Sequence, residues 1–473
     1  MNEAPVFAME TAINEKDIIT RLRERLGRDA VLAGEAVGGK YHVDFSGEHP
    51  AAPLALLRPS STAELAEMLE LCSNARQALV VQGGLTGLAG GATPQRGEIA
   101  LSLERMTGIE EIDRASMTAT VRAGTPLQTL QEAALDAGLV FPLDLGARGS
   151  CTIGGNIATN AGGNQVLRFG MMRNLVLGLE AVLADGTIVS SLNKMLKNNA
   201  GYDLKQLFIG TEGTLGVVTR AVLRLYPRQP VKTSALCAVR GFDEAVALLH
   251  TAQRCLAGSL SAFEAMWAPY FERVLEHVAA LRSPFESRHE IYVLIESEGG
   301  DEAADRERFE RMLETAMEAG MITDAVIAQS ERERRDFWSI RDGIGEITPA
   351  LQPMLSFDVS MPTGEMPAFL ERVDRGFAAT FGQITNLVFG HLGDNNLHLA
   401  VTTGREQDLP KLCDIVYGAA GAHHGSISAE HGIGVLRRDY LHLSRTPQEL
   451  ALMKRLKAAL DPQGILNPGR VVK

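Results

Sequence analysis

The 473-residue sequence has few cysteines, few aromatic residues and no long apolar segment. Its five cysteines are scattered and form no Cys-x-x-Cys pair, which argues against a disulfide framework and indicates reduced thiols in the cytoplasm. Apolar stretches are interrupted by glycine or charge well before the ~20 residues that a membrane span needs. Residues 1–17 are acidic and lack the basic and apolar parts of a secretory or transit peptide.

The chain also lacks an excess of basic residues. Lys and Arg number 46 against 58 Asp and Glu, a formal net charge of −12, so the basic face that nucleic-acid binding requires is not expected. No Gly-x-Gly-x-x-Gly follows a strand-like run, which argues against a dinucleotide-binding Rossmann crevice. Residues 34–40 match the spacing of a phosphate-binding loop, but Tyr41 stands where a Mg²⁺-binding Ser or Thr is needed.

Glycine, by contrast, is abundant, with 47 residues, and hydrophobic residues make up 45% of the chain. That content is enough for sizeable cores at this length, and the pattern predicts an α+β protein of three regions. Residues 1–228 alternate short β-rich runs with amphipathic helices. Residues 229–425 alternate strand-like runs with long charged helices, and residues 426–473 hold a Gly-rich turn followed by a helix.

Two Gly-rich loops stand out in the first region, at residues 81–91 and 142–163. Successive glycines let consecutive main-chain N–H groups point into one concavity, which can bind a pyrophosphate without cations. Tight turns would explain isolated glycines, but the density of these loops and their Ser, Thr and Asn donors favour a nucleotide site. A third segment, 210–219, predicts a turn that enters a strand, for which a simple hairpin is the alternative.

Two later segments gather histidines and carboxylates. His391 and His398 flank a Gly-Asp-Asn-Asn turn, so a hairpin would bring them together. The segment 425–434 places a glutamate directly before a histidine. Two imidazoles and one carboxylate are typical of a metal site with open positions. Hydrogen-bonded surface histidines are the alternative, and this alternative suits the pair at 423–424.

Together these segments, with residues 202–216, resemble the vanillyl-alcohol-oxidase/p-cresol-methylhydroxylase superfamily of flavoproteins over nearly the whole chain. The similarity is greatest to its D-2-hydroxyacid dehydrogenase branch, in particular to members that act on D-2-hydroxyglutarate. It implies a two-subdomain FAD-binding domain of the p-cresol-methylhydroxylase (PCMH) type in 1–228. Next would come a substrate (cap) domain with an antiparallel sheet in 229–425. The last segment, 426–473, would return to the flavin. Relatives with covalent FAD often carry a histidine in the first loop; none occurs in 81–91 here, so non-covalent FAD is expected.

The resemblance also implies site residues. For a divalent metal, commonly Zn²⁺, the implied ligands are His391, His398 and Glu430, with His431 as the general base. Arg341, in a Trp-x-x-Arg motif, and Asn396 are implied to bind the substrate; the arginines at 332 and 334 are expected to be solvated. The implied FAD-binding residues are Gln82, Gly83, Gly84, Leu85, Thr86, Gly87, Leu88, Pro142, Asp144, Gly149, Ser150, Ile153, Gly154, Gly155, Asn156, Ala158, Thr159, Asn160, Glu212, Gly213, Gly216, Val217, Val218 and Asn467.

The implied reaction is oxidation of a small-molecule D-2-hydroxy acid to the 2-oxo acid, with hydride transfer to FAD. D-2-Hydroxyglutarate is the first candidate substrate. Two departures from that subgroup put a narrow preference in doubt, because Ser356 stands where it commonly has Lys and Ala400 where it often has Asn. D-Lactate, D-malate and a broad 2-hydroxyacid range therefore stay open.

Other functions are also compatible with parts of the sequence. A glycolate or aldonolactone enzyme of the same superfamily would share the flavin loops, and a flavin-free metallohydrolase would use only the histidine and glutamate residues. No NAD site is visible, so the resemblance implies an electron-transfer flavoprotein or a quinone as electron acceptor. It also admits a homodimer, although the sequence does not determine the oligomeric state.

Overall fold

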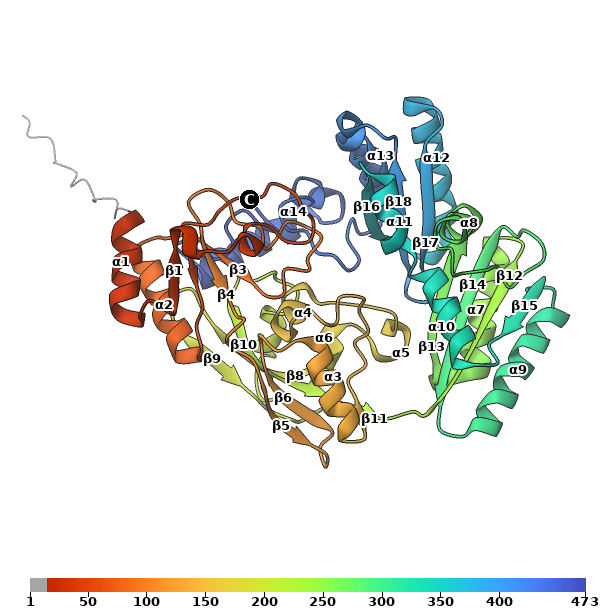
Figure 1. Cartoon of the computed structure of the whole chain (residues 1–473), viewed down its shortest axis with the longest axis horizontal. Helices are drawn as coiled ribbons and strands as arrows, with labels where there is room; N and C mark the ends of the chain where they lie inside the picture. Colours follow the sequence, from red (N-terminus) through yellow and green to blue (C-terminus); the bar gives the residue numbers. More distant parts are fainter. Residues whose placement is uncertain (1–14) are drawn as a thin grey trace, which may run out of the picture.

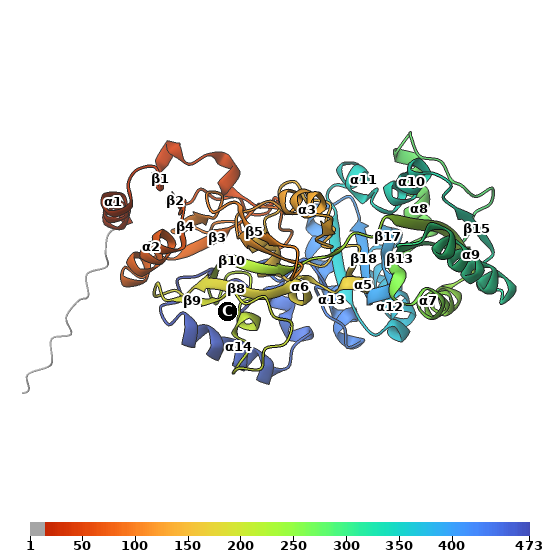
Figure 2. The same cartoon turned by 90° about the horizontal axis from the view of Figure 1, so that it is seen from below.

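The computed structural model describes residues 15–473, so most of the acidic N-terminal segment lies outside the described residues. The chain forms two halves that lie side by side and are joined by an extended connection after β11 (Tyr226–Pro227) (Figures 1 and 2). The second half is built on one large sheet, and the last helix, α14 (Pro447–Leu460), returns to the first half (Figure 1). Helices and sheets are mixed throughout, which confirms the predicted α+β class.

The first sheet of the first half is four-stranded. In spatial order its strands are β1 (Val31–Ala33), β2 (Ala55–Leu57), β4 (Ile99–Ser102) and β3 (Leu79–Gln82). The last three run parallel to one another and are almost entirely buried, which agrees with their continuous apolar sequences. Helices α1 (Glu15–Leu26) and α2 (Thr62–Asn74) pack against this core, and the Ser61 side chain caps α2 by accepting a hydrogen bond from the Glu64 N–H.

The second sheet is five-stranded and antiparallel. Its strands, in spatial order, are β5 (Ile109–Asp113), β6 (Thr118–Arg122), β10 (Val217–Arg224), β8 (Val176–Val182) and β9 (Ile188–Ser191). The short helices beside it are α3 (Leu127–Asp136), α4 (Ile153–Thr159), α5 (Val166–Phe169) and α6 (Met172–Leu175). A two-stranded ribbon pairs β7 (Leu139–Val140) with β11. Helix α4 lies inside the second Gly-rich segment, which the sequence had led us to treat as a loop throughout.

The second half is built on a seven-stranded antiparallel sheet. Its strands, in spatial order, are β15 (Asp324–Ile327), β12 (Val231–Val239), β14 (Ile291–Gly299), β13 (Leu260–Trp267), β17 (Thr385–His391), β18 (Asn396–Thr402) and β16 (Leu355–Ser360). One face packs against α7 (Phe242–Leu256), α9 (Glu302–Glu318), α12 (Met366–Phe381) and α13 (Leu409–Ala422). The other packs against α8 (Ala268–His277), α10 (Glu331–Arg341) and α11 (Ile344–Leu351).

The C-terminal segment is part of the core of the first half. Ile465 and Leu466 are buried among the side chains of the four-stranded sheet. Arg470 is 1% exposed and donates to the Glu98 carboxylate (2.8 Å) and to the main-chain oxygen of Thr93 (2.6 Å). These contacts hold the end of the chain beside the loop that follows β3.

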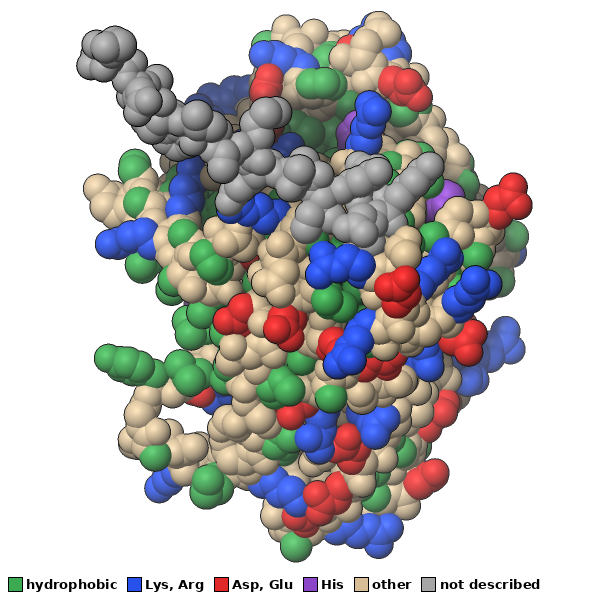
Figure 3. All heavy atoms as spheres, turned by 90° about the vertical axis from the view of Figure 1, so that its left-hand side faces the viewer, with side chains coloured by type: hydrophobic (Ala, Val, Ile, Leu, Met, Phe, Trp, Pro, Cys, Tyr) green, Lys and Arg blue, Asp and Glu red, His purple; other side chains and the backbone are tan. Residues whose placement is uncertain are grey.

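The outer surface shows no concentration of one charge on the side viewed in Figure 3, where acidic and basic side chains alternate. Among residues 15–473, no helix has both the length and the apolar character that a membrane crossing requires.

We expect Arg470→Ala to lower the free energy of unfolding of the first half by about 3–5 kcal/mol, because it leaves the Glu98 carboxylate buried without its cation. Thermal denaturation compared with wild type measures the change. Lys473→Ala is the control, since its side chain is 62% exposed. A loss below about 1 kcal/mol would contradict a structural role for the buried pair.

Candidate active site

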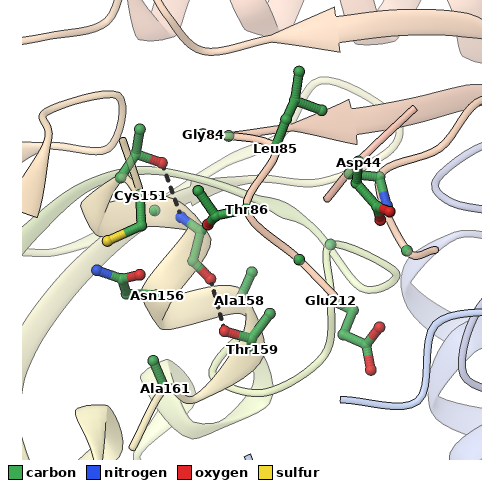
Figure 4. A pocket seen from close by; sticks show the side chains of 18 of the residues that line it. Asp44, Gly84, Leu85, Thr86, Cys151, Asn156, Ala158, Thr159, Ala161 and Glu212 are labelled. Atoms are coloured by element: carbon green, nitrogen blue, oxygen red, sulfur yellow. Dashed lines mark hydrogen bonds between the residues drawn. The ribbon is translucent and has the colours of Figure 1, made fainter. Parts of the chain in front are cut away.

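A cavity of about 350 Å³ lies in the first half, within the range of small-molecule sites. Its walls come from the loop after β3, helix α4, the turn before β10 and three residues of the C-terminal segment, Glu430, His431 and Asn467. Figure 4 shows the loop with Gly84, Leu85 and Thr86 beside helix α4, which carries Asn156 and Thr159, with Glu212 on the turn across the cavity.

The two Gly-rich segments touch each other so closely that side chains would not fit. A Cβ on Gly84 would lie 2.0 Å from the Ser150 oxygen, and one on Gly83 would lie 2.7 Å from the Thr152 hydroxyl. Within the described chain, the main-chain N–H groups of residues 83–88 have no hydrogen-bond acceptor. The side-chain nitrogen of Asn156 is also buried without a partner in residues 15–473. Unsatisfied donors of this kind suit an anionic ligand such as a pyrophosphate.

Most of the predicted cofactor residues line this cavity. They are Gly83, Gly84, Leu85, Thr86, Gly87, Leu88, Gly154, Gly155, Asn156, Ala158, Thr159, Glu212, Gly213, Gly216, Val217, Val218 and Asn467. Seven predicted residues do not line it: Gln82, Pro142, Asp144, Gly149, Ser150, Ile153 and Asn160.

Those seven residues have other positions in the structure. Gln82 donates to the main-chain oxygens of residues 41 and 92 and so supports the loop from behind. Ile153 is 0% exposed and packs into the core because helix α4 turns it inward. The side-chain oxygen of Asn160 accepts from the Arg173 N–H. Gly149 and Ser150 lie on an exposed loop.

Several lining residues were missed by the sequence reasoning. They are Asp44, Val81, Ala89, Gly91, Ala92, Leu103, Leu145, Gly146, Ala147, Cys151, Thr152, Ala161, Gly162 and Phe208. Many are neighbours of predicted residues, so a wider reading of each loop would have included them. Asp44 comes from a distant segment without a motif, and its carboxylate accepts from the Ala92 N–H (3.2 Å).

Glu212 lines the cavity, but its carboxylate is already engaged. It accepts hydrogen bonds from the N–H groups of Ile433 (2.7 Å) and Gly434 (2.8 Å). Burial raises the pKa of Glu212, although these two N–H groups oppose the shift. Glu212 therefore connects the cofactor cavity to the segment that carries Glu430 and His431.

The histidine pair lies on the hairpin of β17 and β18, as predicted. The rings of His391 and His398 are 5.3 Å apart, and their Nε2 atoms lie 3.9 and 3.8 Å from one oxygen of Glu430. Together the three residues offer one ligand atom each within 4.8 Å of one another. The other Glu430 oxygen accepts from the Gly163 N–H (2.9 Å), so this carboxylate joins the hairpin to the second Gly-rich segment.

Glu264 on β13 completes this cluster and was not predicted. It accepts from Nδ1 of His391 (2.9 Å), which leaves Nε2 of that ring facing Glu430. Burial lowers the pKa of His391, but the Glu264 carboxylate raises it to about 9. Burial and the charge of His391 hold the pKa of His398 well below its usual value. A carboxylate bonded to the second nitrogen of a histidine is typical of metal-binding histidines.

The predicted substrate residues lie beside the same cluster. Arg341 is 7% exposed and donates from Nε to Glu264 (2.8 Å) and from Nη1 to Asp342 (3.0 Å), while Nη2 lies 2.8 Å from Nε2 of His391. Asn396 is 3% exposed, and both atoms of its amide lack a partner among the described residues.

The expectation for one neighbouring arginine was wrong. Arg332 is solvated, with 86% of its side chain exposed, but Arg334 is only 20% exposed. Arg334 pairs with Glu296 and Glu331 because α10 lays one of its faces on the sheet.

His431 connects the two parts of the site. It lines the cavity, and its ring stacks at 5.9 Å from that of His398. Its main-chain N–H donates to the Asp358 carboxylate (2.8 Å). The cavity and the histidine cluster therefore form one continuous site between the two halves.

Comparison with known proteins defines the class. The family model described as "FAD linked oxidases, C-terminal domain" matches residues 228–471, and the "FAD binding domain" model matches residues 53–191. The structure is similar to that of p-cresol methylhydroxylase with substrate bound, with a TM-score of 0.76 at 15% identity over 96% of each chain. This likeness confirms the expected fold, and the domain match supports FAD.

The sequence comparison gives the narrower group. The chain is 37% identical to D-2-hydroxyglutarate dehydrogenase, mitochondrial, of Arabidopsis thaliana over 99% of this chain and 83% of that protein. It is 39% identical to D-2-hydroxyglutarate dehydrogenase of Xanthomonas citri over 91% of this chain and 92% of that protein. The bovine mitochondrial enzyme is 40% identical, over 99% of this chain and 86% of the relative. The chain therefore belongs to the FAD-linked oxidase family, in the branch of the D-2-hydroxyglutarate dehydrogenases.

We expect Gly155→Asp to give protein with little or no bound FAD, because the new carboxylate would enter the cavity beside the phosphate-binding N–H groups. The visible spectrum of the purified protein measures the flavin content. Gly258→Asp is the matched control, since a side chain at that exposed position meets nothing within 4 Å. A fully flavin-loaded Gly155→Asp protein would contradict the assignment of α4 to the cofactor.

Proposed function

We propose that this chain oxidises a D-2-hydroxy acid to the 2-oxo acid, with FAD bound non-covalently in the cavity and a divalent metal at His391, His398 and Glu430. The observation that carries the proposal is the placement of Glu430 and His431, which are adjacent in sequence. Both line the cavity, and Glu430 also completes the histidine cluster. The reacting carbon of a substrate bound at the cluster would therefore face the cofactor.

The chain's own groups suit FAD in this cavity. The N–H groups of residues 83–88 and the unpaired amide of Asn156 would hold the pyrophosphate, while apolar side chains such as Val217 and Phe208 line the remainder. No histidine stands in residues 81–91 to form a covalent link. Bound there, FAD supplies the two-electron acceptor of the oxidation.

The cluster likewise suits a small divalent cation. Two imidazoles and one carboxylate favour Zn²⁺ and leave positions open for a substrate. Such a cation supplies a charge that favours the deprotonated form of a neighbouring hydroxyl. The roles left to the chain are then distinct: Arg341 and Asn396 hold the substrate carboxylate and orient it, and His431 accepts the hydroxyl proton.

The residues around the His391–His398–Glu430 cluster indicate which side chain the substrate carries. D-2-Hydroxyglutarate is the substrate in the names of the relatives, and it is our first candidate. Ala400 follows His398 on the same face of strand β18. It is 1% exposed and packs among Phe389 and Leu387. Its partner across the strands is Ser356. Neither residue carries a charge, and this observation favours D-lactate or another acid with a short uncharged side chain as the second candidate.

Two cations of the second half, Arg334 and Lys232, are paired with protein carboxylates. Arg334 bonds to Glu296, and Lys232 lies 2.5 Å from Glu298. A second substrate carboxylate would have to compete with these pairs.

The experiment is a substrate panel on the holoenzyme with an artificial dye acceptor. We expect turnover with D-2-hydroxyglutarate, D-malate or D-lactate and at least a tenfold lower kcat/KM with each L enantiomer. Equal rates with both enantiomers, or a colourless protein that hydrolyses esters or amides, would contradict the proposal.

We also propose an electron acceptor and a location for the protein. An electron-transfer flavoprotein or a quinone suits a chain without an NAD motif, and the five free cysteines support a reducing compartment, which we take to be the cytoplasm. The plant and animal relatives are mitochondrial by name. A homodimer is compatible with the family, and measurement of the mass in solution tests it.

His398→Ala should remove most turnover while leaving the flavin spectrum intact, because His398 belongs to the proposed metal site and does not line the cofactor cavity. Metal content by elemental analysis should fall with activity. His423→Ala is the control, since His423 bonds to Glu365 instead of the cluster. Full activity in protein shown to be free of metal would rule out the metal's role.

Metal affinity should rise with pH. A metal ion must displace the proton that His391 carries below a pKa of about 9, so binding strengthens by up to about tenfold per pH unit until that pH is reached. Competition with a chelator at about pH 6.5, 7.5 and 8.5 measures the slope. A flat profile would show that no proton leaves the site when the metal binds.

A further inference from the structure

Asp358 is the most deeply buried carboxylate beside the site, and none of the roles proposed for the reaction uses it. It lies on β16 directly opposite His398 on β18 and is 0% exposed. Its Oδ2 atom accepts three hydrogen bonds: from the N–H groups of Glu430 and His431, both at 2.8 Å, and from the Ser428 hydroxyl at 3.2 Å. One carboxylate therefore holds the main chain of a proposed metal ligand and that of the proposed base.

The imidazole of His431 lies against the same carboxylate. Its Nδ1 atom is 3.7 Å from Oδ2 of Asp358. Both Nδ1 of His431 and Oδ1 of Asp358 are buried and have no hydrogen-bond partner within residues 15–473. Buried polar atoms are rarely left unpaired, and a proton on Nδ1 would give this nitrogen a donor that faces the Asp358 carboxylate.

We propose that Asp358 is the positioning residue of His431: it keeps the proton on Nδ1 and leaves Nε2 free to accept the substrate's hydroxyl proton. The inference rests on the proposed role of His431 as base. A neutral imidazole has one donor and one acceptor nitrogen, and the partner of one nitrogen decides the state of the other. Asp358 already accepts from the N–H groups of Glu430 and His431, and such hydrogen bonds favour the ionised, accepting carboxylate.

Asp358→Asn separates this role from a merely structural one. The asparagine carbonyl can still accept from the N–H groups of Glu430 and His431, so the segment keeps its anchor. Its NH₂ group, however, donates to Nδ1 and forces the proton onto Nε2, where it blocks proton acceptance. We expect normal FAD and metal content, a KM within about twofold of wild type, and kcat lower by about 10²-fold or more. Asp374→Asn, whose carboxylate bonds only to Asn386 on the far part of β17, is the matched control.

A double-mutant cycle with His431→Ala gives the decisive readout. If Asp358 acts through His431, the double variant is no slower than His431→Ala alone, because the same proton transfer is already lost. A structural defect would instead add to the loss and would also reduce FAD or metal content. Near wild-type kcat in Asp358→Asn, or additive losses in the double variant, would overturn the inference. Near wild-type kcat in His431→Ala would instead overturn the proposed base itself, so the two failures are distinguishable.

The tautomer can also be read without activity. The chain has 11 histidines, so ¹⁵N-histidine labelling of the wild-type holoprotein gives a small set of ring signals, and His431→Ala assigns the one of interest. We expect His431 to be protonated on Nδ1. Protonation on Nε2 would refute the inference even if Asp358→Asn failed to fold.

Discussion

Asp358 and Glu212, one carboxylate from each half of the molecule, hold the segment 428–434 between them, and the site depends on that arrangement. Asp358 binds two successive N–H groups at one end of the segment, and Glu212 binds two at the other. Gly432 has φ +80, and a Cβ there would lie 2.8 Å from the Glu212 carboxylate. A side chain at position 432 would collide with this carboxylate, so the turn requires glycine there. Glu430 and His431 are thereby placed where both halves meet.

The charge balance of this junction supports a cation. Glu264, Asp358 and Glu430 converge there, and among the described residues Arg341 contacts only the first of these carboxylates, Glu264. Burial raises the pKa of Asp394 to about 7, which shows how unfavourable a further negative charge is at this place. Buried carboxylates in excess of cations are costly unless something positive compensates them. A divalent ion at the His391–Glu430 cluster would supply that compensation and leave Arg341 available to a substrate anion.

The sequence predicted those features of the site that depend on short local patterns of residues. Glycine density located both walls of the cavity, and turn residues located the hairpin that brings His391 and His398 together. It failed where a contact joins distant segments: Glu264 is 127 positions from His391 and stands in an apolar strand without a motif. It also failed for Ile153, because helix α4 turns inward a side chain that a loop would have exposed. Such orientations depend on packing, which a single sequence does not display.

Strand register connects these observations. On β18 the residues Asn396, His398 and Ala400 share one face of the sheet because side chains alternate. Asp358 lies opposite His398, and Ser356 lies opposite Ala400, so the row that carries Asp358 and His398 is followed on the same face by a row of two uncharged residues. A slip of one residue would turn His398 to the opposite face and destroy the site. The turn between the two strands places Asn395 in the left-handed region, with φ +70, a conformation that asparagine adopts more readily than most residues, so the hairpin closes tightly enough to bring His391 and His398 together.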